Sequence, residues 1–545
     1  MISEFLRGRV SSGDYSYIDA HFADLMYRMA TPDPGVPFLQ LCLDLSRALR
    51  NQHSCLELAG RDIDRETLRA LPVVGPGTGR EPLVLEGNRL FLQRYFAAEV
   101  RIARRLVGFN RPLAADGALV RQRLATVFPT ASIGQQQAVQ TALTRGLAII
   151  TGGPGTGKTS TVASILSLVA EFTGIAYADI RLAAPTGKAA MRLANALASA
   201  GLPEYTEVVT LHRLLGQRDG GRSFRYGPDL PLPVKLLIVD EVSMIDLAMM
   251  DRLLAALPDD ARLILLGDPD QLPSVDTGSI LADICRGTGT TGATTPEHLL
   301  TDAICPLGTS FRFSPDRGIG RVSAAVQRGE VPPSTDDDEV SSAPLASMNA
   351  ATLATFYADY LALVATGADA PTLIAAFEQQ RVLTPVRDGD YGVVNLNRIL
   401  EETVTAQHPR QSPYYHGRPL LVTNNDYRLR LFNGDVGICI RQADGETRVV
   451  FADGREFLTS GLPGHETCFV MTVHKSQGSE FDRVALVLPE AASESQRDLQ
   501  SREMLYTAVT RARHQVQLYF DGDALRRCVQ NPVVRHSGLA QRFHV

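Results

Sequence analysis

Short apolar runs alternate with stretches of helical periodicity through the middle of this chain. The runs cover residues 148–151, 181–184, 236–239 and 263–266, and polar or glycine-bearing segments follow each of them. A continuous apolar run of this length is typical of a strand buried on both faces. Strands of this kind that alternate with helical patterns predict a parallel α/β sheet.

The end of each predicted strand carries the polar chemistry. The runs are followed in order by GGPGTGKT, PTGKAA, Asp240-Glu241 and GDPDQL. Because parallel sheets place their sites at the carboxyl ends of strands, we expect these loops to converge on one crevice.

A second α/β pattern follows in the C-terminal half. Apolar runs at 382–385, 484–488 and 516–520 predict its strands. Between roughly 413 and 470 the pattern changes to short β-rich segments with turns such as Asn433-Gly434-Asp435, which predict a small inserted β-barrel.

The N-terminal 115 residues carry no recognisable chemistry. Apolar positions at helical spacing in 39–45 and 89–96 predict a small, mostly helical domain, and 111–117 is typical of a linker. Arg101, Arg104 and Arg105 are interpreted as a solvated face, with a DNA or partner contact as the alternative.

Composition limits the class of protein. The chain has 545 residues, a net charge of −6 and a pI near 6.0, so any nucleic-acid site must be a local basic track. Seven scattered cysteines without a C-x-x-C pair argue against a zinc site or a disulfide scaffold. The N-terminus lacks a signal pattern, and we expect a soluble, cytoplasmic protein.

The most informative stretch runs from Gly152 to Thr159. It has the pattern G-x-x-x-x-G-K-[ST] between a predicted strand and a predicted helix, which is typical of a phosphate-binding loop. Backbone N–H groups and the helix N-terminus would cradle the phosphates of ATP. Lys158 would reach the β- and γ-phosphates and Thr159 would hold Mg²⁺. The cradle itself comprises Gly152, Gly153, Pro154, Gly155, Thr156 and Gly157.

Five further side chains fit ATP hydrolysis. We expect Asp240 to hold Mg²⁺ through water, Glu241 to activate the attacking water and Gln271 to sense the γ-phosphate. Arg312 and Arg511 are candidates to supply positive charge from the second α/β domain. They would reach the nucleotide only when the two domains close.

Eight segments give the chain a specific resemblance. GGPGTGKT, APTGKAA, TLHRLLG, VDEVSM, GDPDQLPSV, SFRF, VHKSQGSEF and LYTAVTRAR occur in the order of the superfamily 1 helicase motifs. The chain resembles most closely the RecD family, the α subunits of RecBCD (exodeoxyribonuclease V) complexes. The N-terminal region shares the resemblance more weakly, and its shortness argues against the longer stand-alone RecD-like helicases.

The resemblance implies an architecture and partners. It implies an ATP-driven motor that moves 5′→3′ along single-stranded DNA, in a heterotrimer with RecB-like and RecC-like subunits. The implied domains are a helical N-terminal domain (1–115), a first RecA-like domain (116–308), a second one (309–412 and 471–545) and an inserted Src-homology-3-like barrel (413–470). A stand-alone helicase and a regulatory P-loop subunit remain alternatives.

The resemblance also assigns residues. Gln135 fits the adenine-contacting glutamine, although a polar helix start explains Gln135, Gln136 and Gln137 equally simply. The positions implied to touch DNA are Thr186, His212, Asn433, Thr472, His474 and Ser476. No convincing nuclease cluster of carboxylates with a lysine is present, so we expect nuclease activity to belong to the complex.

Residues 217–226 carry turn chemistry at Asp219-Gly220-Gly221 and aromatics at Phe224 and Tyr226. This pattern predicts a β-hairpin. A strand-separation pin and a passive surface hairpin are both compatible with it.

Overall fold

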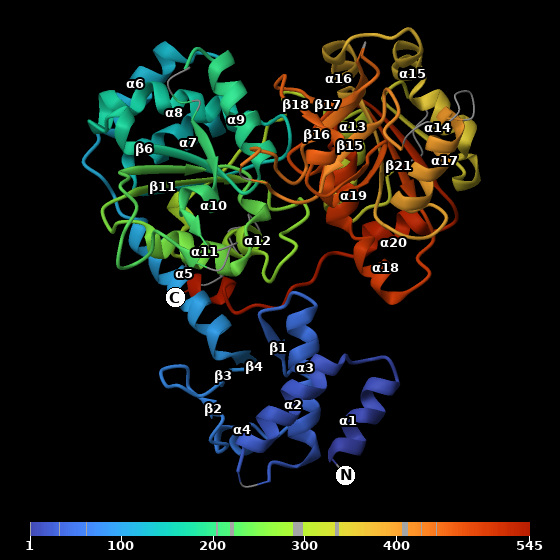
Figure 1. Cartoon of the computed structure of the whole chain (residues 1–545). Coiled ribbons are helices and arrows are strands. Elements are labelled where there is room, and N and C mark those ends of the chain that lie inside the picture. Colours follow the sequence, from blue (N-terminus) through green and yellow to red (C-terminus); the bar gives the residue numbers. More distant parts are fainter. Residues whose placement is uncertain are drawn as a thin grey trace.

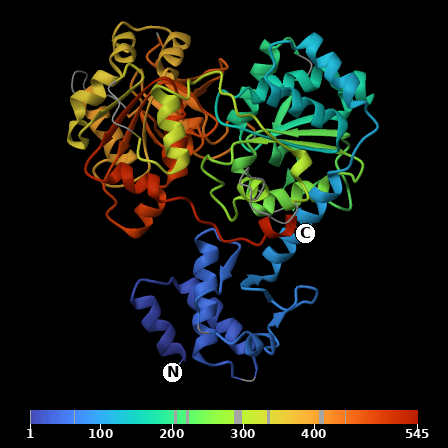
Figure 2. The ribbon, with the colours of Figure 1, turned by 180° about the vertical axis from the view of Figure 1, so that it is seen from behind.

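The computed structural model describes residues 2–544 except 32, 62, 203–204, 206, 219–222, 287–297, 333–336, 406–412, 427 and 443. Two α/β lobes lie side by side above a smaller N-terminal unit (Figure 1). In the view from behind, the last residues of the chain cross from the second lobe back to the first (Figure 2). No described helix is long and apolar enough to cross a membrane.

The first lobe contains a six-stranded parallel sheet in the order β12-β5-β11-β10-β6-β7. The four predicted strands form its centre, and two three-residue edge strands complete it. The strands are β5 (Leu147–Thr151), β6 (Ile180–Ala184), β7 (Val208–Thr210), β10 (Leu236–Val239), β11 (Arg262–Gly267) and β12 (Ile304–Pro306).

Helices cover both faces of this sheet. Along β5, Ile149 belongs to the core under α5 and α11, whereas Ile150 belongs to the opposite core under α7 and α8. This alternation is why the central strands carry apolar residues on both faces; the polar exceptions are Thr151, Arg181 and Arg262. The helices are α5 (Gln93–Phe109), α6 (Gly117–Val127), α7 (Ile133–Thr144), α8 (Lys158–Thr173), α9 (Gly187–Ser199), α10 (Leu211–Leu214), α11 (Leu247–Ala256) and α12 (Ile280–Cys285).

The second lobe contains a five-stranded parallel sheet in the order β13-β22-β21-β14-β20. The strands are β13 (Val340–Ala343), β14 (Gln380–Thr384), β20 (Val470–Thr472), β21 (Phe481–Leu488) and β22 (Ala512–Phe520). Its helices are α13 (Gly318–Arg328), α14 (Ala350–Phe356), α15 (Ala358–Ala365), α16 (Ala370–Glu378), α17 (Val393–Thr405), α18 (Glu494–Leu499), α19 (Arg502–Val509) and α20 (Ala524–Gln530).

The predicted β-rich insertion is a five-stranded antiparallel sheet in the order β18-β17-β16-β15-β19. No ladder joins β18 to β19 in the described residues, so closure into a barrel stays a prediction. The strands are β15 (Pro419–Val422), β16 (Val436–Arg441), β17 (Thr447–Phe451), β18 (Glu456–Leu458) and β19 (His465–Thr467).

The N-terminal unit differs from the sequence prediction. It has helices, but it also contains a four-stranded sheet in the order β1-β4-β3-β2. The segment 89–96 is not one helix, because Arg89–Leu92 forms β4 and α5 begins only at Gln93. A four-residue strand leading directly into a helix mimics helical spacing in the sequence. The remaining elements are α1 (Ile2–Ser11), α2 (Tyr17–Met29), α3 (Gly35–Arg50), α4 (Arg65–Arg69), β1 (Cys55–Glu57), β2 (Val74–Gly75) and β3 (Leu83–Glu86).

Helix α5 joins this unit to the first lobe. Arg101 donates to both carboxylate oxygens of Asp251 at 2.9 and 2.6 Å, and Arg105 donates to the carbonyl oxygens of Leu254 and Leu257. Arg101 and Arg104 are exposed, as a solvated face requires, although Arg101 also pairs with Asp251. For Arg105, which is half-buried against α11 and the residues after it, the interpretation as a solvated face is wrong.

Candidate active site

The glycine-rich loop connects the buried strand β5 to α8, as its pattern predicts. Gly155 and Gly157 have φ values of +76° and +85°, which glycine adopts without strain. A Cβ at Gly155 would lie 2.3 Å from Cβ of Arg312, and one at Gly153 would lie 2.6 Å from the hydroxyl of Tyr506. Both neighbours belong to the second lobe, so the glycines also permit its close approach.

Lys158 begins α8 and turns back over this loop. Its Nζ donates to the carbonyl oxygens of Gly152 at 2.5 Å and Gly153 at 3.1 Å. Thr156 donates from Oγ1 to the carbonyl of Gly153 at 2.8 Å. The loop thus holds the Lys158 ammonium against a backbone cradle, which suits phosphate binding.

The acidic residues lie at the ends of β10 and β11. Burial, reinforced by neighbouring Glu241, raises the pKa of Asp240. Glu241 has a left-handed φ of +54°, a strained conformation for a non-glycine residue that is often found at functional sites. Burial also raises the pKa of Asp268 to about 6; its Oδ2 accepts from Gln271 at 3.0 Å and from the Tyr506 hydroxyl at 3.1 Å.

Four charged side chains meet between the lobes. Nη2 of Arg312 donates to Glu480 at 2.8 Å, and Arg192, from α9 of the first lobe, approaches the same carboxylate at 2.5 Å. Arg511 is 2% exposed and donates to the carbonyls of Thr507 and Ser479. Within the described chain, Nη1 of Arg312 is buried without a hydrogen-bond partner, so it is available to a ligand.

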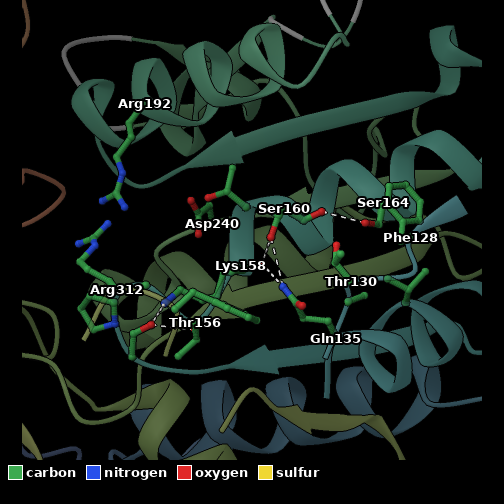
Figure 3. A pocket seen from close by; sticks show the side chains of 18 of the residues that line it. Phe128, Thr130, Gln135, Thr156, Lys158, Ser160, Ser164, Arg192, Asp240 and Arg312 are labelled. Atoms are coloured by element: carbon green, nitrogen blue, oxygen red, sulfur yellow. Dashed lines mark hydrogen bonds between the residues drawn. The ribbon is translucent and has the colours of Figure 1, made fainter. Parts of the chain in front are cut away.

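These groups line a cavity of about 520 Å³ (Figure 3). In Figure 3, Phe128, Thr130 and Gln135 lie on one side and Arg192, Asp240 and Arg312 on the other. The cavity thus has a partly apolar end from α6 and α7 and a strongly charged end, as a nucleotide requires. Sequence reasoning gave no role to Arg192, Glu480, Asp268, Tyr506 and Phe128. Asp268, Glu480 and Tyr506 lie within the motifs GDPDQLPSV, VHKSQGSEF and LYTAVTRAR, which could have singled them out, whereas only the fold brings Arg192 and Phe128 to the cavity.

Gln135 lies beside the loop but its amide is already engaged. It closes a capping box, with Oε1 accepting from the Ser132 N–H at 2.9 Å. Its Nε2 donates to the Ser160 hydroxyl at 3.2 Å and to the Gly157 carbonyl at 3.4 Å. The structure therefore places Gln135 at the cavity wall, and adenine contact stays a prediction.

The first-lobe positions implied to touch DNA start helices. Thr186 caps α9 by accepting from the Ala189 N–H, and His212 lies in α10. Across the cleft, a Cβ added at Gly478 would lie 3.8 Å from Oγ1 of Thr186, so the two lobes meet here. Asn433 lies at the exposed turn between β15 and β16.

The second-lobe positions lie at the end of β20 and in the turn that follows it. Thr472 caps a short turn by accepting from the Lys475 N–H at 3.3 Å, and burial lowers the pKa of His474. Ser476 is fully buried and donates to the Val473 carbonyl at 2.7 Å. In this conformation the Ser476 hydroxyl supports the turn.

The predicted hairpin is present as β8 (Gln217–Arg218) and β9 (Ser223–Phe224); its turn, 219–222, lies outside the described residues. Phe224 packs beside His212 and under the guanidinium of Arg252 at 5.1 Å. Tyr226 packs against the core of the first lobe. Both aromatics therefore pack on the first lobe, and a role in strand separation stays a prediction.

The two parallel sheets, the phosphate loop on one and the arginines from the other define a helicase-type P-loop ATPase. The chain is 35% identical to the RecBCD enzyme subunit RecD of Mycolicibacterium smegmatis over 96% of this chain and 97% of that protein. It is 32% identical to the RecBCD enzyme subunit RecD of Haemophilus influenzae over 84% of this chain and 81% of that protein. The chain belongs to the RecD family.

Other comparisons match parts of the chain. An AAA domain model matches residues 135–277 and a UvrD-like helicase C-terminal domain model matches 467–519. The ATP-dependent RecD2 DNA helicase of Deinococcus radiodurans is 34% identical over 67% of this chain, but over only 46% of its own length. Bacteroides Pif1 bound to ssDNA aligns with a TM-score of 0.39 at 19% identity over 71% of this chain and 91% of that chain.

Glu480 should give the fold a measurable pH dependence. Burial alone would raise its pKa, but Arg192 and Arg312 lower it to about 2 from an ordinary 4.5. A depressed pKa stabilises the fold above pH 4.5, and this contribution is lost as the pH falls towards 2. We expect Glu480→Gln to lower the free energy of unfolding at pH 7 by up to about 3 kcal/mol.

Urea unfolding between pH 7 and pH 3 tests this. The difference between the wild type and Glu480→Gln should shrink on acidification. The control is Glu402→Gln, because Glu402 forms an exposed ion pair with Arg398. A Glu480→Gln effect that is as large at pH 3 as at pH 7 would contradict the assignment.

Proposed function

We propose that this chain is the ATP-driven 5′→3′ motor subunit of a RecBCD-type helicase–nuclease, and that it acts on single-stranded DNA in double-strand-break repair and homologous recombination. One observation carries the proposal: Arg312 and Arg511 of the second lobe line the same cavity as Lys158, Glu241 and Gln271 of the first. Because the cavity needs both lobes, hydrolysis and movement between the lobes become one process.

The residues divide the work of ATP hydrolysis. The loop N–H groups and Lys158 bind the phosphates, and Glu241 orients and deprotonates the attacking water. Gln271 senses the γ-phosphate, while Arg312 and Arg511 neutralise the charge that develops in the transition state.

Mg²⁺ fits the residues present. In the described residues no group of three His, Cys, Asp or Glu could hold a metal by itself. Mg²⁺ is usually held by one or two protein groups and the substrate phosphates, which matches Thr159 and Asp240 beside the cradle. Bound there, Mg²⁺ would neutralise phosphate charge.

The DNA strand is proposed to cross both lobes. Thr186 and His212 would contact it from the first, Thr472 and His474 from the second, and Asn433 from the insertion. Hydroxyl, imidazole and backbone groups would bind phosphates rather than bases, so affinity is expected to depend on salt and not on sequence. Ser476 enters only as support for the turn that carries His474.

The partners are proposed to be RecB-like and RecC-like subunits. We propose four functional units: 1–115, 116–308, 309–412 together with 471–545, and 413–470. The C-terminal residues require one change to this division. Residues 535–543 contact the N-terminal unit and the first lobe rather than the second lobe.

A stand-alone helicase is the alternative. The chain covers almost the whole length of a RecBCD subunit but less than half of the RecD2 helicase, which favours the subunit. Co-purification with two larger subunits from the native host would support it, and a chain that purifies and unwinds alone would favour the alternative.

The direct test of the motor is ATP hydrolysis with and without single-stranded DNA. We expect strong stimulation by DNA in the wild type. Hydrolysis that ignores DNA would contradict the proposal and favour a regulatory P-loop subunit.

A further inference from the structure

The chain does not end on its second lobe. After α20, the Val533 N–H still donates to Glu503 of that lobe at 2.8 Å. The following residues run towards the first lobe (Figures 1 and 2). The carbonyl of His536 accepts from the Ser54 N–H of the N-terminal unit at 2.9 Å, and Phe543 is buried in the core of the first lobe. The tail therefore joins all three units.

Arg535 is the central contact of this tail. Its Nη1 donates to the carbonyls of Asp276 at 2.9 Å and Gly278 at 2.6 Å. Its Nη2 donates to the Ser274 carbonyl at 2.6 Å and to Oε1 of Gln52 at 2.5 Å. Three carbonyls of one loop thus converge on one guanidinium. Only arginine can donate to all three together, because its N–H donors form a planar fork.

Arg535 holds this loop through hydrogen bonds to carbonyls. It is 9% exposed, and among the described residues the carboxylates of Asp283 and Asp276 act on it electrostatically without a close ion pair. Burial lowers the pKa of Arg535 to about 10, so the side chain stays protonated at neutral pH. A cation buried among carbonyls fixes backbone position, and its removal leaves those carbonyls unsatisfied.

The clamped loop continues directly from Gln271. The Leu272 N–H donates to the Thr507 hydroxyl at 2.9 Å, and the Leu272 carbonyl accepts from Gln477 Nε2 at 2.9 Å. Both partners belong to the second lobe. Residues 271–278 therefore connect the second lobe at Leu272 to a far end that Arg535 holds. Two backbone hydrogen bonds assist Arg535 there: the Leu247 N–H donates to the Thr277 carbonyl at 3.0 Å, and the Gly278 N–H donates to the Gln52 carbonyl at 3.1 Å.

We propose that Arg535 is a positioning residue for Gln271: it fixes the far end of this segment, so that closure of the second lobe turns Gln271 towards the γ-phosphate. Without the hydrogen bonds from Arg535, the whole loop would move together with Leu272 when the second lobe closes. The movement would then shift the loop instead of turning Gln271. The inference rests on the proposed function, because it assumes that Gln271 acts in ATP hydrolysis.

The test compares Arg535→Met with Arg542→Met in the full-length protein. Arg542 lies in the same tail and pairs with Glu86 and Glu99, but it makes no hydrogen bond or ion pair to residues 271–278. We expect Arg535→Met to lower the DNA-stimulated kcat by about 10-fold with KM for ATP within about twofold, since small misplacements of a reacting group are costly. Arg542→Met should lower the melting temperature but keep kcat.

Every outcome of this comparison either supports or overturns the role of Arg535. Equal kcat in both variants, or a kcat loss in Arg542→Met as large as in Arg535→Met, would overturn the inference and leave the tail a structural strap. If Arg535→Met fails to fold, Gln52→Met removes one contact only and should give a smaller kcat loss with unchanged KM; an unchanged kcat would overturn the inference. A wild type without DNA-stimulated hydrolysis would refute the proposed function instead.

Discussion

Lys158→Gln is expected to lower DNA-stimulated ATP hydrolysis by at least about 10²–10³-fold, the usual cost of removing one preorganised group that stabilises developing charge. The ammonium at 158 lies 2.5 Å from the Gly152 carbonyl, where it can move onto the phosphates without rearranging the loop. Glutamine keeps much of the length but not the charge. Steady-state ATPase assays at saturating single-stranded DNA measure the effect.

The matched control is Lys235→Gln. Lys235 is an exposed lysine of the same lobe whose ammonium pairs with Asp179 at 2.7 Å, away from the cavity. We expect this variant to hydrolyse ATP like the wild type, and both variants to keep the wild-type melting temperature closely. Lys158→Gln activity within a few-fold of Lys235→Gln activity would contradict the assignment of the phosphate loop.

Arg312→Ala is expected to lower kcat by about 10³-fold or more while the protein still binds single-stranded DNA. Its Nη2 is held by Glu480 at 2.8 Å, and its Nη1 is buried and unpartnered within the described residues. This arrangement leaves Nη1 of Arg312 free to donate to a phosphate of the nucleotide. Arg312→Lys should not restore activity, because an ammonium cannot bind Glu480 and a phosphate with the same geometry.

The control for Arg312 is Arg328→Ala. Arg328 belongs to the same lobe, but it is exposed and pairs with Glu330 at 2.8 Å. Pre-steady-state hydrolysis should be slow in Arg312→Ala and normal in Arg328→Ala. DNA-binding titrations should show that both variants still bind single-stranded DNA. If Arg312→Ala lost DNA binding and hydrolysis together, the residue would act on the DNA track or the fold rather than on the phosphates.

The strongest sequence signals lie where one short segment contains the whole motif. Residues 147–159 combine strand, loop and helix start, and the structure has all three as predicted. The central strands were predictable because both their faces are buried, which makes them apolar at almost every position. The edge strands β7 and β12 have only three residues each and carry too little pattern.

Contacts between distant segments could not be predicted from the sequence. Arg192 and Glu480 are 288 positions apart along the chain, and only the packing of the two lobes brings them to 2.5 Å. The same holds for Arg535 and the loop at 274–278. The sequence assigns the tail to the second lobe because it follows β22 and α20, and nothing in its composition shows that it returns to the first.

The central claim, a motor that moves 5′→3′ on single-stranded DNA, is tested most directly by unwinding of one duplex that carries either a 5′ or a 3′ single-stranded tail. The assay uses the full-length chain with ATP and Mg²⁺, and Lys158→Gln as the inactive reference. We expect efficient unwinding of the 5′-tailed duplex and little unwinding of the 3′-tailed one. A preference for the 3′ tail would contradict it.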